Sequence, residues 1–366
     1  MRLTPQRSPW PLLTLLLLAG AGHIPDVAAQ DTLRIAPGRV CPACRVTTTH
    51  VVALGADAGV HGPMLESRVT RDSRGRYFVA PTYTPGTIAV YGPDGRFQRA
   101  FGTEGEGPGE FRNIGDVTIG PGDSLWVVSG SGRVSVLTPE LEMVRSMSVS
   151  GVDAVLPGAD GRAVVRIGGG ALRHLGPGTE VGEALALPEQ DAMGSPFDNA
   201  LARLPDGTLL APQGTRYRLD VVQPDGTPER VLVRETGWFP AVATNEDFRE
   251  HEQSGAPIGV IIDVGVEPAG RAWVLTYRVE MALLPEIEEE LARTGANMPS
   301  VGLLRRLFAP VIELFDLEAG GVVATGGSTE RFYTSFMDGE HVVGLRELED
   351  GNVVLDLWRL GVRDGS

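Results

Sequence analysis

Six polar residues stand at a repeated position in the sequence and could bind a charged ligand. Each lies seven or eight positions before the residue that ends a predicted tight turn. The oxygen-bearing ones are Asp116, Asp153, Asn199 and Asp263, and the arginines are Arg68 and Arg331. Carboxylate and amide oxygens are the ligands that Ca²⁺ prefers. If these positions converge, the four oxygen-bearing residues predict a calcium site and the two arginines a ligand-binding rim. The alternative is that all six only solvate the mouth of a channel.

The cysteines, Cys41 and Cys44, form a second chemical motif in "RVCPACRV". Zinc needs two further close ligands, and no Cys/His pair is spaced to supply them. Haem attachment needs a histidine where Arg45 stands. In an exported protein this spacing predicts a local disulfide, with a labile or intermolecular pair as the alternative.

No catalytic constellation is visible, so catalytic residues stay unassigned and no organic cofactor is predicted. The glycine-rich stretch "FGTEGEGPGEF" (101–111) has Glu110 where a dinucleotide loop needs its last glycine, and no lysine follows. His61 and His251 fall on predicted connections and are the candidate acid–base residues. His50 and His341 fall within strand patterns, where packing is the expected role.

Six copies of a turn followed by an apolar strand must position these residues. They are "DSRGRYFVA", "GPGDSLWVV", "GADGRAVVR", "LPDGTLLAP", "EPAGRAWVL" and "FMDGEHVVG". Repeats at roughly 40–50 residues are typical of propeller blades with four antiparallel strands each. The sequence therefore predicts an all-β, six-bladed β-propeller of four-stranded antiparallel blades over 46–362, followed by a tail at 363–366.

The ends of the chain suggest how such a ring would close. The last unit, ending in "NVVLDLWRL", supplies three strands, and "RVTTTHVVALG" (45–55) has the pattern of an outer strand. We expect this N-terminal strand to complete the last blade, which removes two exposed strand edges. Residues 30–45, with the cysteine pair, would form the approach to that strand.

The Phe-Gly…Gly-Pro-Gly-Glu-Phe crossing and the repeated Asp-Gly hairpins, over roughly residues 45–362, resemble the NHL-like six-bladed β-propellers of bacterial exported proteins. The resemblance implies a binding or interaction scaffold. Some members of that family are lyases or lactonases that hold a metal in the central channel, so it also allows enzymatic activity.

Two long segments interrupt the repeat, at 238–259 and 281–310. Strand alternation predicts that both emerge on one face of a propeller. Ile287 and Leu291 have helical spacing, and "SVGLLRRLF" has a short amphipathic pattern, so a small helical insert is expected in blade 5. The insert either covers a ligand site or pads a blade edge.

Residues 1–29 have the pattern of a signal peptide: Arg2 and Arg7, an apolar run, then "DVAAQ" with cleavage after Ala29. These residues carry two arginines and one aspartate, so cleavage changes the formal charge from −15 to −16. That charge disfavours nucleic acid as a partner, and no later stretch is apolar enough to span a membrane.

Together these patterns predict an exported binding scaffold, periplasmic or extracellular, with an unknown protein or small-molecule ligand on the insert-bearing face. The alternative is a metal-dependent lyase or lactonase-like hydrolase at the mouth of the central channel.

Overall fold

The computed structural model describes most of the chain after the first thirty residues. The described ranges are 31–35, 39–55, 67–81, 86–130, 132–168, 171–178, 180–185, 200–242, 244–295, 299–327, 332–349 and 352–364. Strands dominate them, and the few helices are short. The segment 1–29, Asn199, Arg331 and His61 lie outside the described residues.

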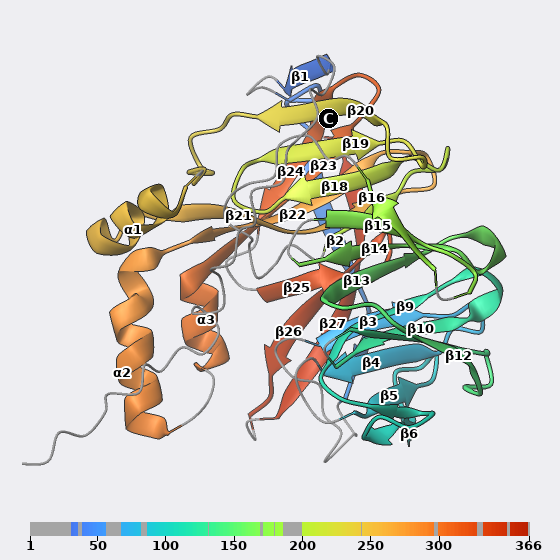
Figure 1. Cartoon of the computed structure of the whole chain (residues 1–366). Helices are drawn as coiled ribbons and strands as arrows, with labels where there is room; N and C mark the ends of the chain where they lie inside the picture. Colours follow the sequence, from blue (N-terminus) through green and yellow to red (C-terminus); the bar gives the residue numbers. More distant parts are fainter. Residues whose placement is uncertain are drawn as a thin grey trace, which may run out of the picture.

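Three sheets each contain four antiparallel strands that follow one another in the chain (Figure 1). The first contains β3 (Ser67–Arg71), β4 (Tyr77–Pro81), β5 (Ile88–Tyr91) and β6 (Phe97–Phe101). The second contains β9 (Ile114–Ile119), β10 (Leu125–Ser129), β11 (Arg133–Leu137) and β12 (Met143–Ser148). The third contains β13 (Val152–Pro157), β14 (Ala163–Ile167), β15 (Ala171–Leu175) and β16 (Val181–Ala184).

A fourth sheet has the same order with one strand added. It contains β17 (Ala202–Arg203), β18 (Leu209–Gln213), β19 (Arg218–Val222) and β20 (Pro228–Arg234). β1 (Asp31–Ile35) pairs in parallel with β20. No strand was expected in "DTLRI", and this pairing covers the outer edge of the fourth sheet with the N-terminal segment.

The remaining strands form one eight-stranded sheet. Its order is β21 (Ile258–Val266), β22 (Ala272–Val279), β23 (Phe308–Asp316), β24 (Gly321–Gly327), β2 (Arg45–Leu54), β27 (Val353–Arg363), β26 (His341–Glu347) and β25 (Phe332–Phe336). A single parallel pair, Arg45 with Thr325, joins β24 to β2. In contrast, β2 pairs antiparallel with β27 along its whole length, the neighbour expected from the sequence.

The turn glycines explain why the first two strands of each sheet can reverse so tightly. Gly75 has φ +82° and Gly207 has φ +94°, a region that side chains rarely adopt. The Gly75 N–H donates to the Asp72 carbonyl at 3.0 Å, and the Gly207 N–H to Leu204 at 2.9 Å. The second strand then runs into the core with both faces covered.

The sheets pack through large aromatic side chains at one repeated strand position. Phe78, Trp126 and Trp273 follow their turns at the same spacing and are almost fully buried. Burial on this scale is the main stabilising term for such a fold. The tryptophans therefore serve packing between sheets.

One buried polar cluster also joins the fourth sheet to β23 and β24. Arg234 donates two hydrogen bonds to the carboxylate of Glu313, at 2.7 and 2.9 Å. Tyr217 donates to the same carboxylate at 2.7 Å and Thr325 at 2.9 Å. Burial raises the pKa of Tyr217 well above its usual value, with the nearby Glu313 charge adding to it, so the phenol stays a donor.

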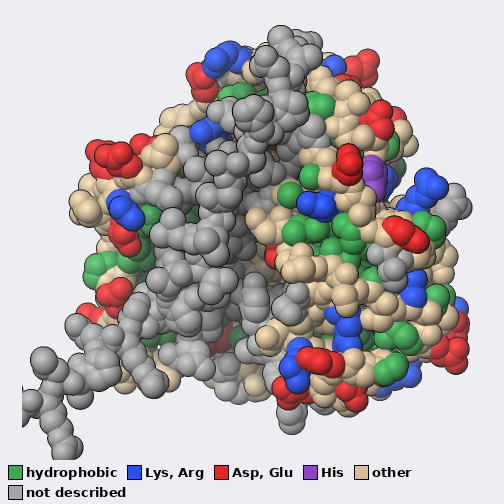
Figure 2. Space-filling model, in the orientation of Figure 1, with side chains coloured by type: hydrophobic (Ala, Val, Ile, Leu, Met, Phe, Trp, Pro, Cys, Tyr) green, Lys and Arg blue, Asp and Glu red, His purple; other side chains and the backbone are tan. Residues whose placement is uncertain are grey.

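Three helices lie together on one side of the molecule (Figure 1). They are α1 (Asn245–Ser254), α2 (Leu284–Thr294) and α3 (Val301–Leu307). Thr244 and Asp247 form a capping box at the start of α1, and Ser300 caps α3 by accepting from the Leu303 N–H. All three contact the short turn η4 (Met281–Leu283). Acidic side chains gather over α1 (Figure 2).

Short elements complete the described structure. A parallel ribbon of β7 (Thr103–Glu104) and β8 (Glu110–Phe111) carries the glycine-rich stretch from the first sheet to the second. Turns η2 (Pro121–Asp123) and η3 (Ala159–Gly161) follow β9 and β13. Among the described residues, no helix has the length and apolar character needed to cross a membrane.

Candidate functional site

Asp116 links two neighbouring sheets through its carboxylate. Its Oδ1 accepts from the N–H of Val117 on β9 at 2.9 Å, and its Oδ2 accepts from the N–H of Val155 on β13 at 3.1 Å. Burial raises the pKa of Asp116, while the Arg68 charge and these two hydrogen bonds act against the rise.

Asp263 makes the same pair of contacts between two other strands. Its Oδ1 accepts from Val264 on β21 and its Oδ2 from Phe336 on β25, both at 2.8 Å. Burial raises the pKa of Asp263 to about 6, with repulsion from Asp116 adding to the rise and Arg68 opposing it. Asp116 thus links β9 to β13, and Asp263 links β21 to β25.

Arg68, Asp116 and Asp263 therefore belong to one electrostatic cluster, although they come from three different first strands. Burial raises the pKa of both carboxyls, and the charge of Arg68 on β3 opposes the rise at each. Of the six polar residues singled out in the sequence, these three carry charges that act on one another in the structure.

The other members of the sequence-derived set are placed differently or not described. Asp153 is the extra residue of a β-bulge in β13, where the pairing with β14 skips from Val152 to Ala154. Asn199 and Arg331 lie outside the described residues. In the part of the chain that the structure covers, Asp116, Asp153 and Asp263 do not gather within 4.8 Å as a metal-binding group. The four-residue calcium site stays a prediction.

Cys41 and Cys44 form a disulfide, with a Cα–Cα distance of 5.3 Å. Asp364 Oδ1 lies 2.9 Å from Cys44 Sγ, so the bridge sits against the end of β27. Both sulfurs are consumed in the bridge and offer no thiolate to a metal in this state.

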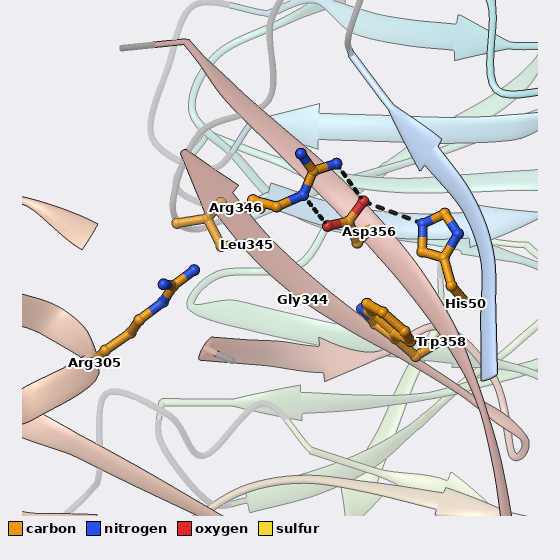
Figure 3. A pocket seen from close by; sticks show the side chains of 7 residues that line it. All are labelled: His50, Arg305, Gly344, Leu345, Arg346, Asp356 and Trp358. Atoms are coloured by element: carbon orange, nitrogen blue, oxygen red, sulfur yellow. Dashed lines mark hydrogen bonds and ion pairs between the residues drawn. The ribbon is translucent and has the colours of Figure 1, made fainter. Parts of the chain in front are cut away.

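A pocket of about 280 Å³ opens between the last strands and helix α3 (Figure 3). Its floor is one face of β2, β27 and β26, and α3, which packs against β25 and β26, forms the opposite wall. The lining residues are His50, Arg305, Gly344, Leu345, Arg346, Asp356 and Trp358.

Strand register brings the floor residues together. His50 pairs directly with Trp358, and Gly344 pairs directly with Asp356. A bulge at Val51 shifts the register beyond His50 and brings its ring toward Asp356. Gly344 has no side chain, which leaves room above the sheet.

The floor of the pocket contains an ion pair, and an aromatic side chain lies beside it. Arg346 donates from Nε and Nη2 to the two oxygens of Asp356, at 2.6 and 2.9 Å. His50 Nε2 lies 3.2 Å from Asp356 Oδ1, and its ring meets Trp358 edge-on with centroids 4.9 Å apart. The hydrogen bond to Asp356 raises the pKa of Arg346, which keeps this pair ionised.

The two neighbouring arginines of α3 behave differently. Arg306 makes a two-pronged ion pair with Glu286, at 2.5 and 2.8 Å. Arg305 points from α3 into the pocket (Figure 3). Its Nε is buried and has no hydrogen-bond partner among the described residues. One guanidinium is therefore used within the fold, and the other faces the pocket.

His50 falls within a strand, where core or surface packing was expected, and its ring does pack edge-on against Trp358. It also lines the pocket, which the sequence did not indicate. His251, a candidate acid–base residue, has its Nδ1 2.9 Å from the Pro257 carbonyl and lines no part of this pocket. His61 stays untested. One feature of the sequence could have indicated the pocket: Arg305 is a charged residue within the largely apolar helical stretch "SVGLLRRLF".

The fold is similar to those of proteins whose structures have been solved. A Bacteroides fragilis protein provisionally described as exported superimposes with a TM-score of 0.58 at 9% identity, covering 91% of this chain and 100% of its own. At that identity the likeness concerns the fold alone. Three four-stranded antiparallel sheets of consecutive strands, and a fourth with one strand added, are the pattern of a β-propeller fold.

Other similar structures have lower scores. They include virginiamycin B lyase from Staphylococcus aureus (TM-score 0.47, 10% identity, 86% of this chain and 99% of that one) and the Swd1 β-propeller domain of Myceliophteria thermophila (TM-score 0.47, 12% identity, with the same coverage). These scores are too low to support a functional argument. The sequence matches no protein-family model, and no curated protein is significantly similar to it.

Proposed function

We propose that the protein is an exported, six-bladed β-propeller that binds a small molecule in the pocket between its last strands and helix α3. The insert-bearing side of the molecule is thus its binding side. The observation that carries this proposal is the pocket itself, whose walls come from the N-terminal strand, the C-terminal strands and the second insert.

The blade count rests on how the eight-stranded sheet divides. Its two halves, β21–β24 and β25–β27 with β2, meet through one residue pair, whereas strands within each half pair over four or more residues. Each half then matches the four-stranded pattern of the other sheets. With β2 beside β27, the N-terminal strand closes the sixth blade.

A ligand screen by thermal shift tests the binding proposal. A ligand that binds only the folded protein stabilises it by about 2.7 kcal/mol at one hundred times its Kd. At least one small molecule should raise the melting temperature of the wild-type protein, and His50→Ala should reduce that rise. His341→Ala, which removes a histidine paired with Asp338 outside the pocket, is the control. Hits that are insensitive to His50→Ala would reject the pocket as the site.

Export is supported by the signal-peptide pattern and by the disulfide between Cys41 and Cys44. Mass spectrometry of the mature protein should find Gln30 at its N-terminus. Recovery of the unprocessed chain from the cytoplasm alone would contradict this part of the proposal.

The second candidate is the metal-dependent lyase or lactonase-like enzyme, with Ca²⁺ bound between first strands. One observation favours it: Asp116 and Asp263 are buried carboxylates from two different first strands, and the charge of one acts on the other. Arg68 already supplies a positive charge there, so we rank this candidate second. A stoichiometric calcium content and a melting temperature that rises with Ca²⁺ would reverse the order.

A further inference from the structure

We propose that the ligand of this pocket is a small organic carboxylate with a flat, apolar body, held by Arg305 and placed against Trp358. This inference rests on the proposed function, because it names the chemical class that the same pocket would take.

The charge of the pocket favours a monoanion. Arg346 is neutralised by Asp356 through two hydrogen bonds, so this pair adds no net charge. Arg305 remains as the uncompensated positive charge among the lining residues. In a chain of formal charge −15, a local positive site discriminates in favour of an anion. One net positive charge matches a carboxylate better than a doubly charged phosphate.

Arg305 also has unused hydrogen-bonding capacity. Its Nε is a buried donor without a partner among the described residues, which destabilises the ligand-free state. The planar guanidinium presents donors in the fork geometry that a carboxylate accepts. Leu303, Leu304 and Leu307 are buried and anchor α3 to the sheets, so the helix that carries Arg305 is fixed before a ligand arrives.

The remaining walls are apolar or aromatic. Trp358 and Leu345 line the pocket beside the charged groups, and Gly344 leaves its floor without a side chain. An aromatic face of this kind accepts the flat surface of a ring. The volume of about 280 Å³ lies just below the usual range for drug-sized ligands, which limits the ligand to a small molecule.

Isothermal titration calorimetry with matched probes tests this inference. Benzoate and indole-3-acetate are compared with their neutral amides, and phenyl phosphate is compared with benzoate. At least one carboxylate should bind, with its amide at least tenfold weaker and phenyl phosphate no tighter than benzoate. Equal binding of acid and amide, tighter binding of the phosphate, or no binding of either carboxylate would overturn the inference.

Substitutions then locate the anion. Arg305→Gln should weaken carboxylate binding about tenfold or more, since charge-assisted hydrogen bonds are worth roughly 1.5–3 kcal/mol. Arg305→Lys keeps the charge and should retain part of the affinity. Arg306→Gln removes the neighbouring, ion-paired arginine and should leave affinity unchanged. A Gln variant that melts like wild type and binds equally well would contradict the assignment.

The two proposals fail separately. If a neutral or cationic molecule binds and loses affinity in Trp358→Leu, the pocket still binds a small molecule but the carboxylate class is wrong. If carboxylates bind with no dependence on Arg305, His50 or Trp358, both proposals are wrong.

Discussion

The carboxylate of Asp263 on β21 accepts a hydrogen bond from the backbone N–H of Phe336 on β25 at 2.8 Å, and so links the two outermost strands of the eight-stranded sheet. Asp116 makes the corresponding contact between β9 and β13, where it accepts from the Val155 N–H. These residues were singled out in the sequence as calcium ligands. Their observed contacts assign them a structural role in holding these strands together.

Stability should depend on the protonation of Asp263. Its pKa is about 6 in the folded protein against an ordinary value of 3.8. The folded state therefore holds the proton more tightly than the unfolded state. The resulting stabilisation is complete below about pH 4 and is lost as pH rises through 6, by at most about 3 kcal/mol. Urea unfolding of the wild-type protein and of Asp263→Asn across pH 4–8 measures this loss of stability.

The difference in unfolding free energy between the two proteins isolates Asp263 from other titrating groups. The wild-type advantage should shrink as pH rises. A difference that stays constant from pH 4 to pH 8 would show that burial does not perturb this carboxyl.

Asp116→Ala should destabilise the protein by about 2 kcal/mol. The substitution leaves the N–H groups of Val117 and Val155 without their acceptor. Asp94→Ala, in an exposed turn, serves as control and should change stability by about 0.5 kcal/mol or less. Chemical denaturation gives the free energy of unfolding of both variants. Equal losses in Asp116→Ala and Asp94→Ala would show that Asp116 does not link the sheets.

The strand order was largely predictable from sequence because it depends on local signals. Glycine turns such as Gly75 and Gly207 and buried strands after them repeat along the chain, and "RVTTTHVVALG" could be recognised as an outer strand. β1 was missed because "DTLRI" is short and has no turn of its own, so only the exposed edge of β20 gives it a partner.

Glu313→Ala should cost about 3–5 kcal/mol, because it leaves the buried Arg234 charge and the Tyr217 hydroxyl unpaired. Glu235→Ala breaks the exposed pair with Arg34 and should cost under about 1 kcal/mol. Denaturant titration of both variants checks the contrast. A small effect at Glu313 would mean that water enters the cluster.

Replacing both cysteines by serine should lower stability by about 2 kcal/mol, since the bridge closes a loop of only a few residues. Thiol titration of the denatured wild-type protein should detect no free thiol before reduction. Two free thiols in freshly purified protein would refute the disulfide, and equal melting temperatures would deny it a stabilising role.

The pocket was beyond sequence reasoning because it depends on register. His50 and Trp358 are far apart in the chain and become neighbours only when β2 pairs with β27. A shift of one residue would turn His50 to the other face. Arg305 reaches the site only because α3 packs beside β26.

The pairing of β2 with β27 is the central claim, because it brings the N-terminal strand against the C-terminal strands and assembles the pocket. Thr49 and Arg359 are exposed and paired in this register. In a background without the natural cysteines, Thr49→Cys with Arg359→Cys should form an intramolecular disulfide in the monomer, detected as a loss of about 2 Da. The control pairs Thr49→Cys with Arg99→Cys on β6 and should stay reduced. A disulfide in the control pair and none in the Thr49–Arg359 pair would contradict the pairing of β2 with β27. The pocket, which depends on that pairing, would then be wrong as well.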